Sequence, residues 1–167
     1  MVVPIADQSN PLLVGFVDVL HDVSGLGCCA GLLVLNQHSE PVEFVFNRSP
    51  SGCDSGPFRA LWPQRNAARS EGRALLQSLF SACRSDPAVL IAPEEHVDVR
   101  LLALDIRIGI PFALLWTDAP DVLRWVPAQP PEGVKEVVAE LGKLAPLAEP
   151  IERVKKGLLE AYLPPPS

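Results

Sequence analysis

The chain has 167 residues, of which 48% are hydrophobic and 20% charged, so it is long enough to form one domain with its own core. Its net charge of -6 argues against a free-standing nucleic-acid-binding protein, whose contact surface is usually basic, but is compatible with an acidic cluster that binds Mg²⁺. The mean hydropathy of +0.21 is high for a soluble monomer. Either the core is unusually large for this length, or a protein partner or another copy of the chain covers part of the apolar surface, and we favour a partner.

The sequence contains no segment that predicts export or membrane insertion. Its first residues, MVVPIADQSN, lack the basic start and apolar core of a secretory signal. The longest apolar run, residues 101–116, includes Asp105 and Arg107 and is too short to span a bilayer. We therefore expect a cytoplasmic protein without membrane contact, in which the cysteines stay reduced.

Residues 12–48 predict a three-stranded antiparallel meander, because three runs rich in Val, Leu and Phe are separated by the turn sequences DVSGLG and QHSE. Alternation in the first strand places Phe16, Asp18 and Leu20 on one face. A carboxylate on an otherwise apolar face needs a partner or a metal, so Asp18 either meets an Arg or a backbone amide, or binds a cation. In the third strand, Glu43 is expected to be exposed to solvent.

Residues 65–84 predict an amphipathic helix, with Glu71 at the border of its apolar stripe. The short apolar run at 88–92 is typical of a strand buried on both faces. Glu94 and Glu95 follow Pro93 in a sequence that favours the start of a helix, where acidic residues are stabilised by the helix dipole.

Residues 96–110 fit both a helical and an alternating pattern. We expect a helix that ends near Gly109, then a buried strand over 110–116. Residues 117–120 (TDAP) are expected to cap a short helix that carries Leu123 and Trp125.

The C-terminal part has a different composition. Residues 127–133 (PAQPPEG) form a stiff connector, and residues 134–144 and 151–163 have the periodicity of two amphipathic helices. The sequence thus predicts an α/β sheet domain at 1–126, a Pro-rich connector at 127–133, and a C-terminal helical hairpin with its tail at 134–167.

The predicted order is a three-stranded antiparallel meander, continued by two parallel buried strands with flanking helices. This order resembles the ribonuclease H-like superfamily, and the segments GFVDV, VLIAPEE and LLALDIRIGIPFALLW are similar to endonuclease V, over about residues 12–118. The resemblance implies Mg²⁺ or Mn²⁺ ions that clamp a phosphodiester and are held by carboxylates. The candidate catalytic and metal-binding residues that it implies are Asp18, Glu71, Glu94 or its neighbour Glu95, and Asp118. The chain departs from endonuclease V after the fourth strand, where Pro93 and Glu94 stand in place of an aspartate with a glycine-rich turn.

The cysteines suggest a zinc site as a second possibility, with the histidines that lie near them in sequence. Structural zinc usually shows paired ligands two to four residues apart, and the sequence has no C-x-x-C motif, so buried free thiols are favoured. The residues concerned are Cys28, Cys29, Cys53, Cys83, His21 and His38.

Three functions remain open. The first is a non-catalytic α/β subunit of a larger assembly, including one that acts on nucleic acid, with no cofactor expected. The second is a metal-dependent nuclease that uses the four acidic positions with Mg²⁺ or Mn²⁺. The third is a small-molecule or peptide sensor similar to roadblock or PAS modules. The positive hydropathy and the acidic charge favour the first.

Overall fold

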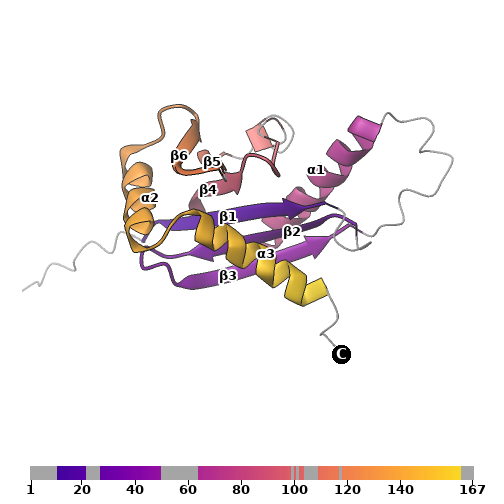
Figure 1. Cartoon of the computed structure of the whole chain (residues 1–167), viewed down its shortest axis with the longest axis horizontal. Coiled ribbons are helices and arrows are strands. Elements are labelled where there is room, and N and C mark those ends of the chain that lie inside the picture. Colours follow the sequence, from indigo (N-terminus) through magenta and orange to yellow (C-terminus); the bar gives the residue numbers. More distant parts are fainter. Residues whose placement is uncertain are drawn as a thin grey trace, which may run out of the picture.

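The computed structural model describes residues 11–21, 27–49, 64–98, 100, 102–103, 109–116 and 118–162; for residues 64–71, 120 and 121 it describes the backbone alone. Within these ranges the chain is an α/β protein with one mixed sheet and three helices (Figure 1). The elements in chain order are β1 (Leu13–Leu20), β2 (Cys29–Leu35), β3 (Pro41–Arg48), α1 (Gln64–Ala82), β4 (Pro87–Pro93), β5 (Phe112–Trp116), β6 (Ala119–Val126), α2 (Glu132–Leu144) and α3 (Ala148–Tyr162).

The strands lie in the order β3-β2-β1-β4-β5-β6. β1, β2 and β3 pair antiparallel, β1 pairs parallel with β4, and β4 pairs parallel with β5. The predicted meander, continued by two parallel buried strands with β1 at the centre, is confirmed. The predicted C-terminal helical hairpin is also present, and each of its helices begins two or three residues earlier than expected.

The helices cover the two faces of the sheet. α2 and α3 pack on one face and α1 on the other (Figure 1). Alternation along β1 divides its side chains between these faces: Phe16 and Leu20 contribute to the core under α2 and α3, whereas Val17 and Val19 contribute to the core under α1. The hairpin therefore shares a hydrophobic core with the sheet. None of the helices within the described ranges combines the length and apolar character needed to cross a membrane.

Two glycines allow α3 to lie close to the sheet. A Cβ atom at Gly31, in β2, would stand 2.9 Å from Cγ1 of Val154, and one at Gly157, in α3, would stand 2.9 Å from Cζ of Phe44. Ordinary carbon contacts are longer than this, so any side chain at either position would push the helix away. Because Gly31 pairs directly with Asp18 of β1, α3 covers the sheet beside that carboxylate.

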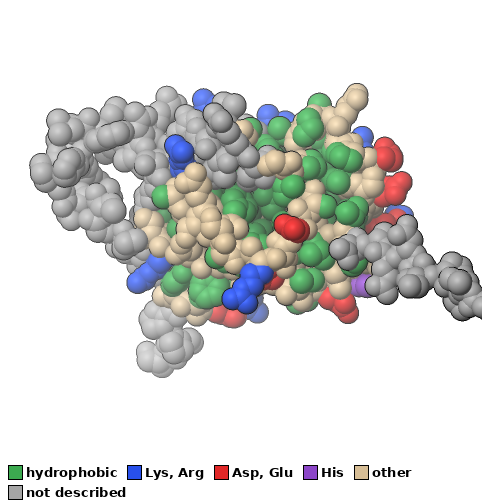
Figure 2. Space-filling model, turned by 180° about the vertical axis from the view of Figure 1, so that it is seen from behind, with side chains coloured by type: hydrophobic (Ala, Val, Ile, Leu, Met, Phe, Trp, Pro, Cys, Tyr) green, Lys and Arg blue, Asp and Glu red, His purple; other side chains and the backbone are tan. Residues whose placement is uncertain are grey.

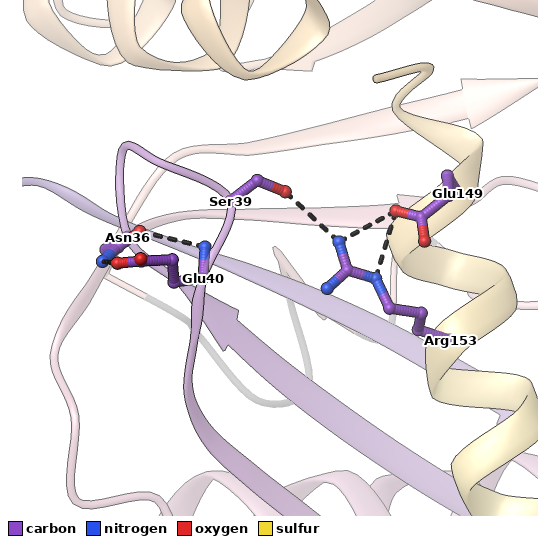
Figure 3. Close-up of polar contacts among 5 residues, drawn as sticks. All are labelled: Asn36, Ser39, Glu40, Glu149 and Arg153. Atoms are coloured by element: carbon purple, nitrogen blue, oxygen red, sulfur yellow. Dashed lines mark hydrogen bonds and ion pairs between the residues drawn. The ribbon is translucent and has the colours of Figure 1, made fainter. Parts of the chain in front are cut away.

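The turn between β2 and β3 is attached to the same helix (Figure 3). Arg153 of α3 donates a hydrogen bond to Oγ of Ser39 at 3.2 Å and pairs with Glu149 at 2.8 Å. Within the turn, Oδ1 of Asn36 accepts the backbone N–H groups of His38 and Glu40. These bonds fix the start of β3 relative to α3.

The expectation that Glu43 faces solvent is wrong. Its half-buried carboxylate accepts the backbone N–H groups of Arg84 at 3.0 Å and Ser85 at 2.8 Å, just after the end of α1. Hydrogen bonds from the Ser85 side chain and from these two backbone groups lower the pKa of Glu43 to about 2, and burial partly opposes this shift. Glu43 thus joins β3 to the connection between α1 and β4.

The prediction of a short helix after residues 117–120 is also wrong. This segment is β6, an antiparallel neighbour of β5. Leu123 and Trp125 pack in the core under α2 and α3, while Val126 packs on the α1 face, which is the alternation of a strand. Half of the helix expected over 96–109 lies outside the described residues. The strand expected from residue 110 begins at Phe112.

Candidate functional site

Three of the acidic positions singled out in the sequence lie at one edge of the sheet. β1, β4 and β5 are parallel, so their carboxyl ends meet there, which is where open α/β sheets commonly bind ligands. Asp18 is near the end of β1, Glu94 directly follows β4, and Asp118 follows β5. The side chain of Glu71, on α1, lies outside the described part of the structure.

Asp18 is enclosed by the core, with only 1% of its surface exposed. Its Oδ1 atom accepts the backbone N–H of Val19 and the Nδ1–H of His96, each at 2.8 Å. Its Oδ2 atom is buried and has no hydrogen-bond partner among the described residues. Burial raises the pKa of Asp18, and the bond and charge of His96, the Val19 amide and the charge of Lys155 on α3 partly oppose that shift.

His96 is the residue of this site that the sequence did not single out. It lies three positions after the end of β4 and is 41% exposed, so one ring nitrogen holds the buried carboxylate while the rest of the ring reaches solvent. The expectation that a backbone amide satisfies Asp18 is confirmed by Val19, but the basic partner is a histidine and not an arginine. Two features of the sequence could have indicated this pair. They are an acid on the apolar face of β1 and a histidine just after the adjacent parallel strand.

Glu94 is engaged by a different basic residue. Its Oε1 atom forms an ion pair with Arg124 of β6, and its buried Oε2 atom has no hydrogen-bond partner in the described ranges. Arg124 pairs in register with Leu114, which packs under α1. Glu94 also continues the alternation of Leu90 and Ala92 on that face. Asp18 faces α3, so the two carboxylates lie on opposite faces of the sheet.

Asp118 and Glu95 do not complete a metal-binding cluster with these two carboxylates. Asp118 is exposed in the connection between β5 and β6, and Glu95 is exposed in the turn after β4. Among the residues that the structure describes, no three His, Cys, Asp or Glu side chains gather closely enough to hold a metal ion. The two buried, unpaired carboxylate oxygens have the chemistry of Mg²⁺ ligands, but their opposite orientation and the Arg124 contact do not fit a shared two-metal centre.

Among the described cysteines, Cys29 and Cys83 are free thiols. Cys28 packs on the α1 face and Cys29 on the α3 face, and both are buried, as alternation predicts. Sγ of Cys28 lies 3.4 Å from Nδ1 of His21. Burial raises the pKa of Cys29 and of Cys83. Cys53, the fourth candidate zinc ligand, lies outside the described residues.

Comparison with solved structures gives a distant likeness. No protein-family model matches the chain, and no curated protein matches its sequence. Among solved structures, endonuclease V from Bacillus subtilis is similar, with 14% sequence identity and a TM-score of 0.42. The alignment covers 63% of this chain and 44% of that protein, so the chain matches less than half of that protein's length. This is a weak structural relationship.

Proposed function

We propose that this chain is a non-catalytic α/β subunit of a cytoplasmic protein assembly. The observation that carries the proposal is the environment of Asp18, which is buried beneath α3 and hydrogen-bonded to His96. An acidic residue used in this way holds the turn after β4 to the central strand. Its role is then in the fold and not in a reaction.

The positions of the acidic residues support this reading over a nuclease. Two-metal hydrolysis needs several carboxylates that converge on the ions, and a path for the phosphodiester to reach them. Asp18 is almost fully covered, and Glu94 lies on the other face of the sheet in an ion pair with Arg124. Both carboxylates are already bonded to basic side chains of the chain itself.

Exposed apolar side chains supply the contact surface that a subunit needs. The largest of them occur on the outer strands β3 and β6, at the end of β5, and at the ends of other elements: Leu12, Val42, Phe46, Trp116, Val122 and Leu144. Figure 2, seen from the side opposite to α3 in Figure 1, shows hydrophobic side chains that reach the surface over the centre of that face. In an assembly that acts on nucleic acid, the partner would supply the basic contacts, because this chain carries a net charge of -6.

The catalytic alternative is tested with the purified chain, Mg²⁺ or Mn²⁺, and single-stranded and duplex DNA and RNA. We expect no cleavage above the level given by Asp18→Asn, with His38→Gln, an exposed turn substitution, as the matched control. Metal-dependent cleavage that disappears in Asp18→Asn and persists in His38→Gln would overturn the proposal and establish the nuclease.

The subunit role is tested by cross-linking the chain in its native cells and identifying the linked residues by mass spectrometry. We expect links from a protein, which includes another copy of this chain, to the exposed outer strands β3 or β6. Substituting Phe46 and Val122 by Ser should reduce the recovery of that protein. A chain that gives no links to any protein under conditions that preserve assemblies would contradict the role.

A further inference from the structure

The backbone of β3 has unused hydrogen-bonding groups along its outer edge. The N–H of Ser49 donates to the C=O of Cys28, and the register pairs the neighbouring Arg48 with Cys29. Bonded and non-bonded pairs alternate in an antiparallel ladder, so Val45 and Asn47 bond toward β2. The backbone groups of Phe44, Phe46 and Arg48 therefore point away from β2, at the end of the sheet order. Of these, the N–H of Arg48 donates to Oδ1 of Asn47 at 2.8 Å, so the unused groups are those of Phe44 and Phe46 and the C=O of Arg48.

The other outer strand, β6, is less suited to receive a strand. Its register shifts next to Trp116, so only Leu123 to Val126 continue the regular pairing with β5, and Pro120 lies in the irregular part. Irregular pairing and proline are both features that protect an edge. From Glu43 to Arg48, β3 is regular and has no proline or lysine.

We propose that two copies of the chain associate through β3, paired antiparallel about a two-fold axis at Phe46. In this register Phe46 lies opposite its own copy, and Arg48 of each chain lies opposite Phe44 of the other. The outward N–H groups of Phe44 and Phe46 then each meet a C=O of the other copy, and the two sheets become continuous. The partner in the assembly proposed above is then a second copy of this chain, and the dimer rests on that proposed function.

Side-chain chemistry selects this register. Phe46 is 45% exposed and already contacts the rings of Phe44 and Tyr162, so a second Phe46 extends an aromatic cluster. Arg48 lies 5.4 Å from the Tyr162 ring centroid, and a Phe44 ring from the other chain suits the same cation. No like charges face each other, because Glu43, the strand's other charged residue, lies opposite Ser49 on the other face.

The test is the mass of the full chain in solution, measured by sedimentation over a range of concentrations. We expect a dimer whose dissociation constant rises roughly tenfold or more in Phe46→Lys, which places two cations on the axis. Ala139→Lys, which adds the same charge at an exposed position of α2, is the control and should leave the constant unchanged. A monomer at every concentration, or a dimer that Phe46→Lys leaves intact, overturns the proposal.

A cross-linking variant tests the register without depending on the stability of Phe46→Lys. Directly opposed residues of a bonded pair have Cα atoms about 5.5 Å apart, within disulfide range. Phe46→Cys should therefore give a disulfide-linked dimer on mild oxidation, at a yield above that of the unaltered chain. Val42→Cys, which is off the axis, should not. A disulfide-linked dimer from Val42→Cys and not from Phe46→Cys would refute the register. A chain that stays monomeric but binds a different protein would refute the dimer and leave the proposed function standing.

Discussion

Nδ1 of His96 lies 2.8 Å from Oδ1 of Asp18, across the junction between the turn that follows β4 and the central strand β1. The two residues are 78 positions apart in the chain. A carboxylate that is 1% exposed is costly to keep unless it is hydrogen-bonded. The bond therefore stabilises the turn after β4 and the burial of Asp18 together.

The coupling between these residues is measurable in a double-mutant cycle. His96→Ala should lower the free energy of unfolding by about 1 to 3 kcal/mol, because it removes a donor from a buried acceptor. In an Asp18→Asn background the same change should cost less, with a coupling of about 0.5 to 3 kcal/mol. Urea denaturation of the four proteins gives the value. Strictly additive effects would show that the bond does not stabilise the fold.

The stability due to Asp18 should depend on pH in a defined direction. Burial raises its pKa above the ordinary value of 3.8, so the folded state binds the proton more readily than the unfolded state. Its contribution is fully present below about pH 3.8 and is lost as the pH rises through the raised pKa. The stability of the unaltered chain relative to Asp18→Asn should thus fall as the pH rises from about 3. A relative stability that grows with pH over this range would contradict the burial of an ionisable Asp18.

Glu43 should show the opposite dependence, because hydrogen bonds lower its pKa to about 2. Its contribution is present above the unfolded pKa of about 4.5 and disappears as the pH falls toward 2. Glu43→Gln should cost about 1 kcal/mol near neutral pH, after allowance for solvent screening, and progressively less in acid. Glu152→Gln, at an exposed position of α3, is the control and should change stability little. Equal losses from both substitutions would remove the assigned role of Glu43.

A pair of glycine substitutions tests how closely α3 lies on the sheet. Gly157→Leu should destabilise the chain by about 1 to 3 kcal/mol, because its Cβ would meet the Phe44 ring at 2.9 Å. Gly142→Leu gains similar helix propensity in α2, where the nearest atom to an added Cβ is 3.9 Å away, and should be neutral or stabilising by up to about 1 kcal/mol. Thermal unfolding compares the two. A Gly157→Leu chain as stable as Gly142→Leu would show that α3 does not pack on β3 as described.

The sheet was predictable because hydrophobic runs and turn residues directly encode strand order. The runs around Asp18, Cys29 and Phe44 have strand length, and the turn sequences between them leave little choice but a meander. The β6 segment was misassigned because Thr117 and Asp118 favour a helix start locally, whereas pairing with β5 decides its conformation. Local propensity is weak where a neighbouring strand offers a complete set of hydrogen bonds.

The candidate site was only partly predictable. Parallel strands place Asp18 and Glu94 at the same edge, and that much follows from strand order. The sequence did not show on which face of the sheet each carboxylate lies. For Glu94 this depends on side-chain alternation that continues past the end of β4, and on its ion pair with Arg124 of β6, a strand that was not predicted. His96 could not be chosen over other basic residues without the turn that brings it back to β1.

The central claim, that Asp18 is a structural residue and not a metal ligand, is tested most directly by crystals grown with Mn²⁺ and measured at wavelengths where manganese scatters anomalously. We predict no manganese peak at Asp18 and an intact hydrogen bond from His96 to Oδ1. A peak within bonding distance of Asp18 Oδ2, shared with Glu94 or Glu71, would contradict the account.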